Sequence, residues 1–245
     1  MNAGIKIITT LALVIIGGNV FGQFSANGKI EFERRTNLEK KFKGNDSPWM
    51  NKVNLKKPKI ETFYLYFDDS SSLFLPSDVV DDDPRMSWMT SKNKVYQNFK
   101  ADQLLEIMSF WGSELVVGDT IKERVWKMTN KRRVIAGYDC RRAIWDANDS
   151  TRIYAWYAEE LMCSSGPETF NGLPGMILGL ATEDGGVVYF AKEVLKDNFD
   201  VEKRIPKVKE KDKMTEAQIR KAVTEQYGGR DDFDVKQMLD EMFLW

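Results

Sequence analysis

The pattern of apolar and polar residues along this chain is mostly that of short β-strands. In residues 28–34, Ile30 and Phe32 fall on one side of an extended segment, and the charged residues between them fall on the other. The same alternation returns in residues 60–67, where Phe63 shares a side with the apolar residues two and four positions on. A period of two is typical of strands with one buried side, so both segments are predicted to be half-buried strands.

Further strands are expected along most of the chain. The run 176–182 is nearly all apolar, which favours a central strand covered on both faces. The segment 103–110 suits either a strand or a helical turn. Polar turns rich in Asp, Asn, Ser or Gly separate neighbouring segments, as in antiparallel hairpins. The remaining expected strands are 72–75, 94–99, 114–118, 124–129, 134–145, 151–157 and 187–191.

This succession of strands predicts a mainly β fold. Residues 23–196 are expected to form one antiparallel sheet domain that curls into a barrel or a sandwich. Residues 197–245 are expected to be a charged linker and two α-helices that pack on the β domain or trail from it. The first helix should begin at Thr215, because Gln218 three residues later completes a capping box. The second is expected over about residues 234–243, where apolar residues recur at helical spacing.

The N-terminus has the features of a cleavable export signal, residues 1–22. Lys6 precedes about ten largely apolar residues, and a pair of glycines ends that run before the roughly 20 residues that a spanning helix needs. The expected cleavage lies between Gly22 and Gln23. We therefore expect an exported protein, in the periplasm or on the cell surface, without a membrane span once the signal is removed.

The composition argues against several classes of function. The formal net charge is −1, whereas nucleic-acid binding needs a basic face. The sequence has no histidine, which rules out Ser-His-Asp and Cys-His catalysis and histidine-containing zinc sites. No catalytic residue, metal site or cofactor is therefore predicted. The acidic stretches 81–83 and 146–149 lack the spacing of a calcium loop and are interpreted as solvated loops.

Cys140 and Cys163 are the only cysteines. In an oxidising compartment such a pair can form a disulfide. Folding the expected hairpin about residue 148, however, places Cys140 opposite residue 156 and leaves Cys163 well beyond that point. Two alternatives stay open, a disulfide between them and two buried thiols.

Several glycine and proline residues lie in the segment just before the apolar strand 176–182. Pro174 and Gly175 suit a type II turn, because proline presets φ at the first central position and glycine supplies a positive φ at the second. The spacing of a phosphate-binding loop is absent. The segment is interpreted as a rigid turn that orients the central strand, with a ligand-contacting loop as the alternative. Its motif residues are Gly166, Pro167, Gly172, Leu173, Pro174 and Gly175.

Residues 153–160 and 171–178, which lie around this turn, resemble the signature of the GLPGLI family. Members of this family are signal-bearing proteins of Bacteroidetes-type bacteria. The resemblance extends over roughly residues 93–195. This sequence departs from the family pattern at Met176, where leucine is usual, and at Met162, where proline is usual. The resemblance implies an envelope location and a β-rich fold, and it assigns no activity. Family members often occur beside TonB-dependent outer-membrane receptors.

Three residues near this motif are candidates for binding. Tyr154 and Trp156 share one side of the expected strand 151–157, and Glu160 follows it; packing in the core is the alternative role for the aromatic residues. We expect an exported envelope accessory protein that binds a partner protein or a small ligand, in association with a TonB-dependent receptor as the resemblance implies. The alternatives are an envelope enzyme that uses carboxylates or a metal ion, and an envelope assembly factor whose C-terminal helices hold a client.

Overall fold

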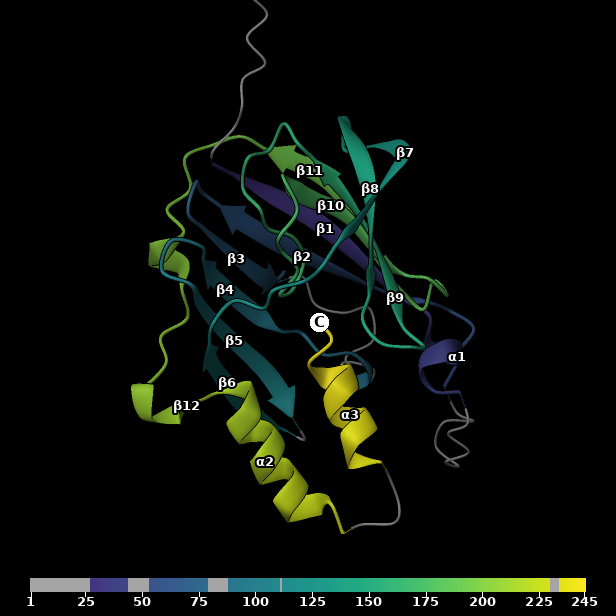
Figure 1. Cartoon of the computed structure of the whole chain (residues 1–245), viewed down its shortest axis with the longest axis vertical. Coiled ribbons are helices and arrows are strands. Elements are labelled where there is room, and N and C mark those ends of the chain that lie inside the picture. The colour runs from purple at the N-terminus through teal and green to yellow at the C-terminus, as the bar shows by residue number, and fades with distance from the viewer. Residues whose placement is uncertain (1–26, 44–52, 79–87, 111, 230–233) are drawn as a thin grey trace, which may run out of the picture.

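A single sheet dominates the fold of this protein. The computed structural model describes residues 27–43, 53–78, 88–110, 112–229 and 234–245. Within these residues the sheet has twelve strands, and two of the three α-helices follow it near the C-terminal end (Figure 1). The expected signal peptide and its cleavage site lie outside the described residues. No helix in the described part of the chain combines the length and the apolar character needed to cross a membrane.

The strands lie in the order β12-β6-β5-β4-β3-β2-β1-β11-β10-β9-β8-β7. All neighbours are antiparallel except β12 and β6, which are parallel. The strands are β1 (Gly28–Thr36), β2 (Lys59–Phe67), β3 (Ser71–Pro76), β4 (Lys94–Asn98), β5 (Gln103–Phe110), β6 (Ser113–Asp119), β7 (Lys127–Ile135), β8 (Tyr138–Asp146), β9 (Arg152–Ala158), β10 (Met176–Thr182), β11 (Val187–Leu195) and β12 (Lys213–Met214). The helices are α1 (Leu38–Lys41), α2 (Glu216–Tyr227) and α3 (Val235–Met242).

Most of the predicted elements are confirmed. The ambiguous segment 103–110 is a strand, β5. α2 begins at the predicted capping box: the Thr215 side chain accepts from the Gln218 backbone N–H at 3.2 Å, and the Gln218 side chain accepts from the Thr215 N–H at 2.8 Å. The prediction of one strand over 134–145 was wrong, because Ala136 and Gly137 have φ of 48° and 86° and turn the chain between β7 and β8.

The sheet is single and open, and the expected barrel or sandwich is not formed. β7 and β12 stand at the two ends of the strand order, with a neighbour on one side only. Where a sandwich would have a second sheet, residues 159–175 between β9 and β10 lie against the face that carries Ile30 and Phe32. We call that face the inner face and residues 159–175 the signature loop. Because Phe170 and Leu173 of the loop are buried in the same core cluster as the strands, the loop supplies the second layer.

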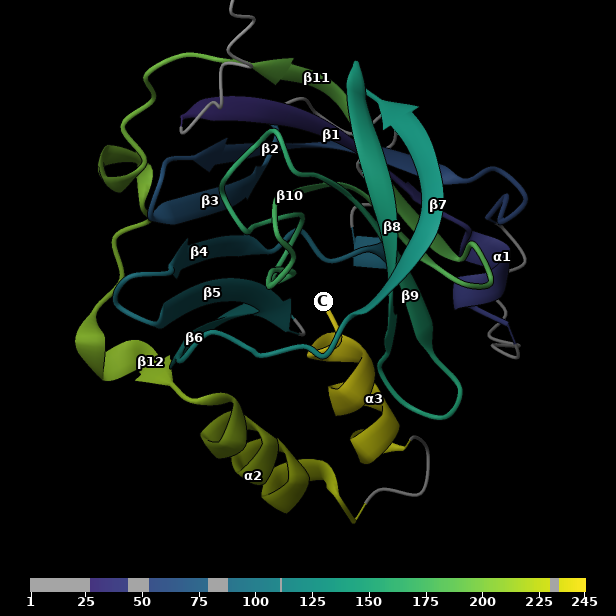
Figure 2. The ribbon, with the colours of Figure 1, turned by 45° about the horizontal axis from the view of Figure 1, so that its top comes forward.

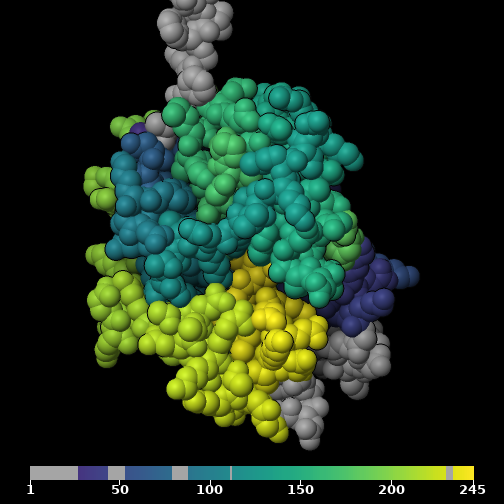
Figure 3. All heavy atoms as spheres, in the orientation of Figure 1, coloured from purple at the N-terminus to yellow at the C-terminus, as the bar shows by residue number. Residues whose placement is uncertain are grey.

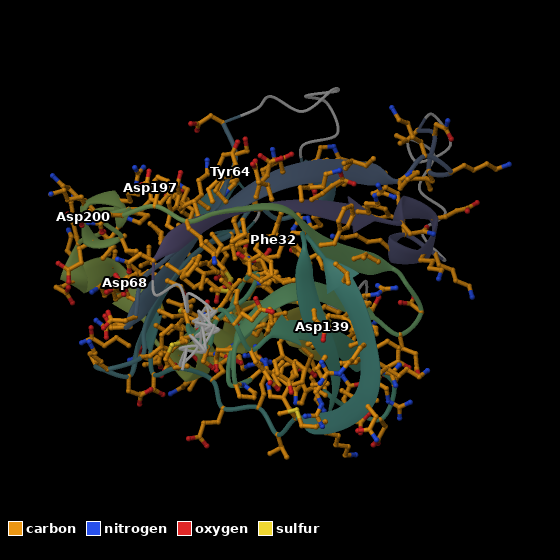
Figure 4. All side chains as sticks on the ribbon, turned by 90° about the horizontal axis from the view of Figure 1, so that it is seen from above. Phe32, Tyr64, Asp68, Asp139, Asp197 and Asp200 are labelled. Atoms are coloured by element: carbon orange, nitrogen blue, oxygen red, sulfur yellow. The ribbon has the colours of Figure 1, made fainter. Side chains whose placement is uncertain are left out.

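Alternation along β1 and β2 builds the core of the inner face. The rings of Phe63 and Phe74 stack with centroids 4.9 Å apart, and Phe32 meets Phe74 edge-on at 6.3 Å. Figure 4 shows Phe32 on the enclosed side of the sheet and Tyr64 on the opposite side. α2 and α3 form a separate small core with β5 and β6, which contains Met108, Val117, Ile219, Val223, Val235, Leu239 and Phe243.

Candidate functional site

Charged residues interrupt the apolar alternation at one end of the inner face. Arg34 of β1 lies directly opposite Glu61 of β2 on one side and Tyr189 of β11 on the other. All three side chains point to the same face as Ile30 and Phe32, because strand residues two apart share a face. Three neighbouring strands thus carry one buried polar row across the sheet.

Arg34 is the centre of this row. Its Nε and Nη2 donate to Glu61 Oε2 at 3.1 and 2.6 Å, and its Nη1 donates to the Tyr189 hydroxyl at 3.1 Å. The Glu61 carboxylate also accepts from the Thr90 hydroxyl at 2.7 Å and lies 3.3 Å from the Lys59 ammonium. Burial disfavours the charged guanidinium, yet Tyr189, Glu61 and Glu168 together hold the pKa of Arg34 above its ordinary value.

The signature loop adds Glu168 to the row. Its φ is +54°, a left-handed conformation that is uncommon for a residue other than glycine. The Tyr189 hydroxyl donates to Glu168 Oε1 at 2.5 Å, and Arg34 Nη1 lies 3.6 Å from the same oxygen. Burial raises the pKa of the Glu168 carboxyl, against the opposing effect of Arg34. Its second oxygen, Oε2, is buried and has no hydrogen-bond partner.

A second acidic group lies further along the sheet. Glu106 of β5 is 1 % exposed and accepts from the Asn93 side-chain amide at 3.2 Å. Asn93 is also close enough to Glu168 to oppose the rise in that group's pKa. Burial raises the pKa of Glu106 to about 7. Arg124 is among the cations near enough to lower it, but Arg124 bonds elsewhere, donating to the Thr169 carbonyl and hydroxyl, both at 2.8 Å.

Four polar atoms of this group are buried without a hydrogen-bond partner: Asn93 Oδ1, Glu106 Oε2, Arg124 Nε and Glu168 Oε2. We call the group the inner-face polar cluster; it comprises Arg34, Glu61, Asn93, Glu106, Arg124, Glu168 and Tyr189. A pocket of about 260 Å³ is lined by sheet neighbours of Glu106, although none of the seven residues lines it. Val117, which pairs with Glu106, and Leu104 both line that pocket, together with Lys122 and Glu216.

The motif residues of the signature loop hold the loop against the sheet. An added Cβ on Gly175 would lie 2.2 Å from the Ala158 carbonyl oxygen, and one on Gly166 would lie 2.7 Å from the Ile177 Cβ. Gly175 has φ of +143°, more extended than the roughly +80° of the expected type II turn. Its N–H donates to the Leu173 carbonyl at 2.8 Å, so the turn spans three residues.

The remaining motif residues lie in the same tight segment. Gly172 has a positive φ of +87°, and Pro167 is buried whereas Pro174 is exposed. Two side-chain bonds fix the loop to the inner face: Ser165 to Ser72 at 2.7 Å and Asn171 to Gln97 at 2.9 Å. The loop thereby holds Glu168 over the polar row.

The binding candidates named from the sequence lie away from this cluster. Tyr154 and Trp156 share one side of β9, as expected, and it is the side opposite the inner face. The Tyr154 hydroxyl donates to Glu183 at 2.5 Å, and the Arg133 guanidinium lies 4.6 Å from the centroid of the Trp156 ring. Glu160 is exposed in the turn after β9. The structure does not bring the three into one pocket.

Cys140 and Cys163 are both free and buried. Cys140 lies in β8, whereas Cys163 Sγ lies 4.0 Å from the Ser71 carbonyl of β3. Of the two alternatives that the sequence leaves open, the structure shows buried thiols. Burial raises the pKa of Cys140 to about 12 and that of Cys163 above its ordinary value, so neither thiol is activated as a nucleophile.

The inner-face polar cluster can bind and can move protons. Its unpartnered donor and acceptors could form hydrogen bonds with a small polar ligand. The Glu106 carboxyl, with a pKa of about 7, can serve as an acid or a base at neutral pH. Within the described ranges, no three His, Cys, Asp or Glu side chains are placed to hold a metal ion.

Comparisons with known proteins find a family profile that matches a short segment and solved structures with a similar fold. The profile of a family described as "Protein of unknown function (Porph_ging)" matches residues 146–179. No curated protein matches the sequence. Among solved structures, one of PNGF-II in space group P21 has a TM-score of 0.52 at 14% identity and covers 78% of this chain. A second PNGF-II structure, in space group C2, has a TM-score of 0.48 at 15% identity and covers 71%.

The likeness to PNGF-II concerns the fold alone. This chain spans about a third of that protein, 32% in the P21 structure and 28% in the C2 structure. At such low identity the shared arrangement of strands carries no information about shared chemistry. The functional argument therefore rests on the residues of this chain.

Proposed function

Since residues 146–179 match the profile of the GLPGLI family, as the sequence predicts, we propose that this protein is an exported envelope protein that binds a ligand at the inner-face polar cluster. The ligand is a small polar molecule or a segment of a partner protein. The observation that carries the proposal is the grouping of four unpartnered, buried polar atoms, one of them on Glu106, whose sheet neighbours line a pocket.

The energetic cost of this grouping supports binding. A buried donor or acceptor without a partner costs about 1–3 kcal/mol, and folded proteins contain few of them. The left-handed backbone at Glu168 adds strain of the kind that concentrates at functional sites. Replacing a buried ion pair by apolar residues of similar volume is often neutral or stabilising, so stability alone gives little reason to keep these charges. A ligand that pairs with the free atoms would offset the cost.

Export and a partner in the envelope are part of the proposal. The apolar run that follows Lys6 supports export. The family resemblance supports an accessory role beside a TonB-dependent receptor. Detection of a mature N-terminus at Gln23 in periplasmic or surface fractions would agree with export. An intact Met1 in the cytosolic fraction would contradict it.

The direct test is cross-linking in native cell envelopes, followed by mass spectrometry of the captured species. We expect one dominant partner or ligand with the unaltered protein and its loss with Glu168→Gln, which changes the charge inside the cluster. Glu183→Gln is the matched control, because Glu183 is exposed in the turn after β10 and bonds to Tyr154 and Arg152 instead of the cluster. Equal capture by both variants would place binding outside the cluster.

A carboxylate-dependent enzyme is the second candidate. It is favoured by the raised pKa values of Glu106 and Glu168, two acids from distant parts of the chain that both lie near Asn93. Turnover of an envelope-derived substrate with a pH profile centred near 7, abolished by Glu106→Gln with retained folding, would establish it. Unchanged turnover in that variant would exclude Glu106 as the acid or base.

A further inference from the structure

The last residues of the sequence cover the inner-face polar cluster. The ring of Trp245 packs against Phe170 and Tyr189, with both pairs of centroids 5.8 Å apart. The Thr169 N–H donates to the main-chain oxygen of Trp245 at 3.0 Å, and the Thr169 hydroxyl bonds to the same oxygen. Figures 1 and 2 show this end of the chain in the middle of the molecule, between the sheet and α3.

The residues that contact Trp245 also contact members of the inner-face polar cluster. Tyr189 turns its ring to Trp245 and donates its hydroxyl to Glu168. The Arg124 guanidinium lies 4.3 Å from the centroid of the Phe170 ring, and its Nε has no partner. Trp245 is itself only partly buried. It therefore sits between solvent and the groups whose pairing is incomplete.

The segment that carries Trp245 packs through Val235, Leu239 and Phe243 into the small core with α2, β5 and β6, which is separate from the main core of the sheet. α3 has eight residues, and an isolated helix of that length is marginal in water. Lys122 donates to the Phe243 carbonyl at 2.9 Å, and Arg220 pairs with Asp240 at 2.8 Å on the surface. In Figure 3 the yellow segment of α3 lies between the yellow-green α2 and the teal strands β7 to β9. Such a segment can open locally while the sheet stays folded.

We propose that Arg124, Thr169, Phe170 and Tyr189 form a recognition site for an aromatic residue of a peptide together with its main-chain oxygen. Residues 243–245 occupy this site within the same chain until a partner peptide of the same chemistry displaces them. The inference rests on the proposed function and deepens it, because it names the ligand class and the step that controls access.

The chemistry of the site selects this ligand. Two donors of Thr169 converge on one oxygen, which suits a main-chain oxygen as acceptor. The rings of Phe170 and Tyr189 suit a third ring in tilted or edge-on contact. An aliphatic residue would lose the ring contacts, and a ligand without an acceptor would leave the Thr169 N–H unpaired at a cost. Occupation within the chain lowers the apparent affinity for a partner by the fraction of molecules that are closed.

The experiment uses the full chain with Trp245→Ala and a fluorescent synthetic peptide of residues 239–245. The variant should bind this probe at least about tenfold more tightly than the unaltered protein, because the site is no longer occupied from within. A control peptide with alanine in place of tryptophan should not bind. Equal affinities of the variant and the unaltered protein, or equal binding of both peptides, would overturn the proposal.

Hydrogen exchange on the unaltered protein gives an independent measurement that does not depend on a variant folding. Amides of α3 should exchange faster than those of β1, and saturating probe should speed their exchange further. Protection of α3 equal to that of β1, unaffected by the probe, would also overturn the proposal. If these tests fail while envelope cross-linking still depends on Glu168, the proposed binding function stands and only the peptide assignment falls.

Discussion

Arg34 and Glu61 face each other on adjacent strands with Arg34 Nη2 2.6 Å from Glu61 Oε2, and their side chains are only 5% and 1% exposed. Removal of both charges from water is costly, and their attraction repays it only with good geometry and further hydrogen bonds. Thr90 and Tyr189 supply such bonds, as does the Ser91 carbonyl, which accepts from Arg34 at 2.6 Å. Replacing either Arg34 or Glu61 alone should therefore cause a large loss in the free energy of unfolding.

The variant Arg34→Met should be strongly destabilised. It leaves Glu61 buried with the Lys59 ammonium 3.3 Å away, and breaking a buried pair costs about 3–5 kcal/mol of the free energy of unfolding. The double variant Arg34→Met/Glu61→Leu should recover part of this loss, because the buried Glu61 charge is gone, although Lys59 and Glu168 each lose an oppositely charged partner. Urea denaturation checks both. A double variant less stable than the single one would contradict the argument.

Gly175→Ala should destabilise the signature loop against β9. The new Cβ would meet the Ala158 carbonyl oxygen at 2.2 Å, and φ of +143° is strained for any other residue. Strain of this kind alone costs on the order of 1–3 kcal/mol, and the clash adds to it. Gly185→Ala is the matched control, since φ there is +68° but nothing lies within 4 Å of the new Cβ. Thermal unfolding should show a clearly larger loss at Gly175; equal losses would mean that the close approach has no role.

Most of the strands could be predicted from the sequence, because apolar and polar residues alternate within each strand. Residues 28–34 predict β1 from Ile30 and Phe32 alone, and the acidic turn 146–149 predicts the hairpin of β8 and β9. The register of that hairpin was less accessible: Arg142, not Cys140, lies opposite Trp156. The open single sheet was also missed, because nothing in the strand pattern shows that a loop will cover the inner face.

The polar cluster was missed because its members are far apart in the chain and each resembles an ordinary surface residue. One signal was available. Arg34 has the same strand parity as Ile30 and Phe32, and Glu61 has that of Phe63, so each charge falls on the apolar side of its own strand. Glu168 offers no such signal, since its place depends on how the signature loop folds back onto the sheet.

The two thiols should be unreactive in the folded protein. The pKa of Cys140 is raised to about 12 by burial, and Cys163 is 3% exposed, so iodoacetamide at pH 8 should modify neither at an appreciable rate. In urea both should react. Intact mass under non-reducing conditions should show two free thiols, and the loss of two hydrogen masses would reveal a disulfide that the structure lacks.

Glu106 should make the protein less stable as the pH rises from about 4.5 to about 7. Burial raises its pKa in the folded state to about 7 from the ordinary 4.5, so the folded protein binds this proton more tightly than the unfolded chain does. The free energy of unfolding then falls with rising pH across that window, by on the order of 2–3 kcal/mol from this group, and is flat above it.

Glu106→Gln isolates this effect from that of the other buried acid, Glu168. The amide has no charge to bury, so the variant should gain stability over the unaltered protein as the pH rises from 5 to 8, with little difference at pH 4. Because Glu168 contributes to both proteins, it largely cancels in the difference. Urea denaturation at each pH gives the two curves. A difference that does not change with pH would show that Glu106 is ionised at its ordinary pKa and that water reaches its carboxylate, which would also remove the acid–base argument for this site.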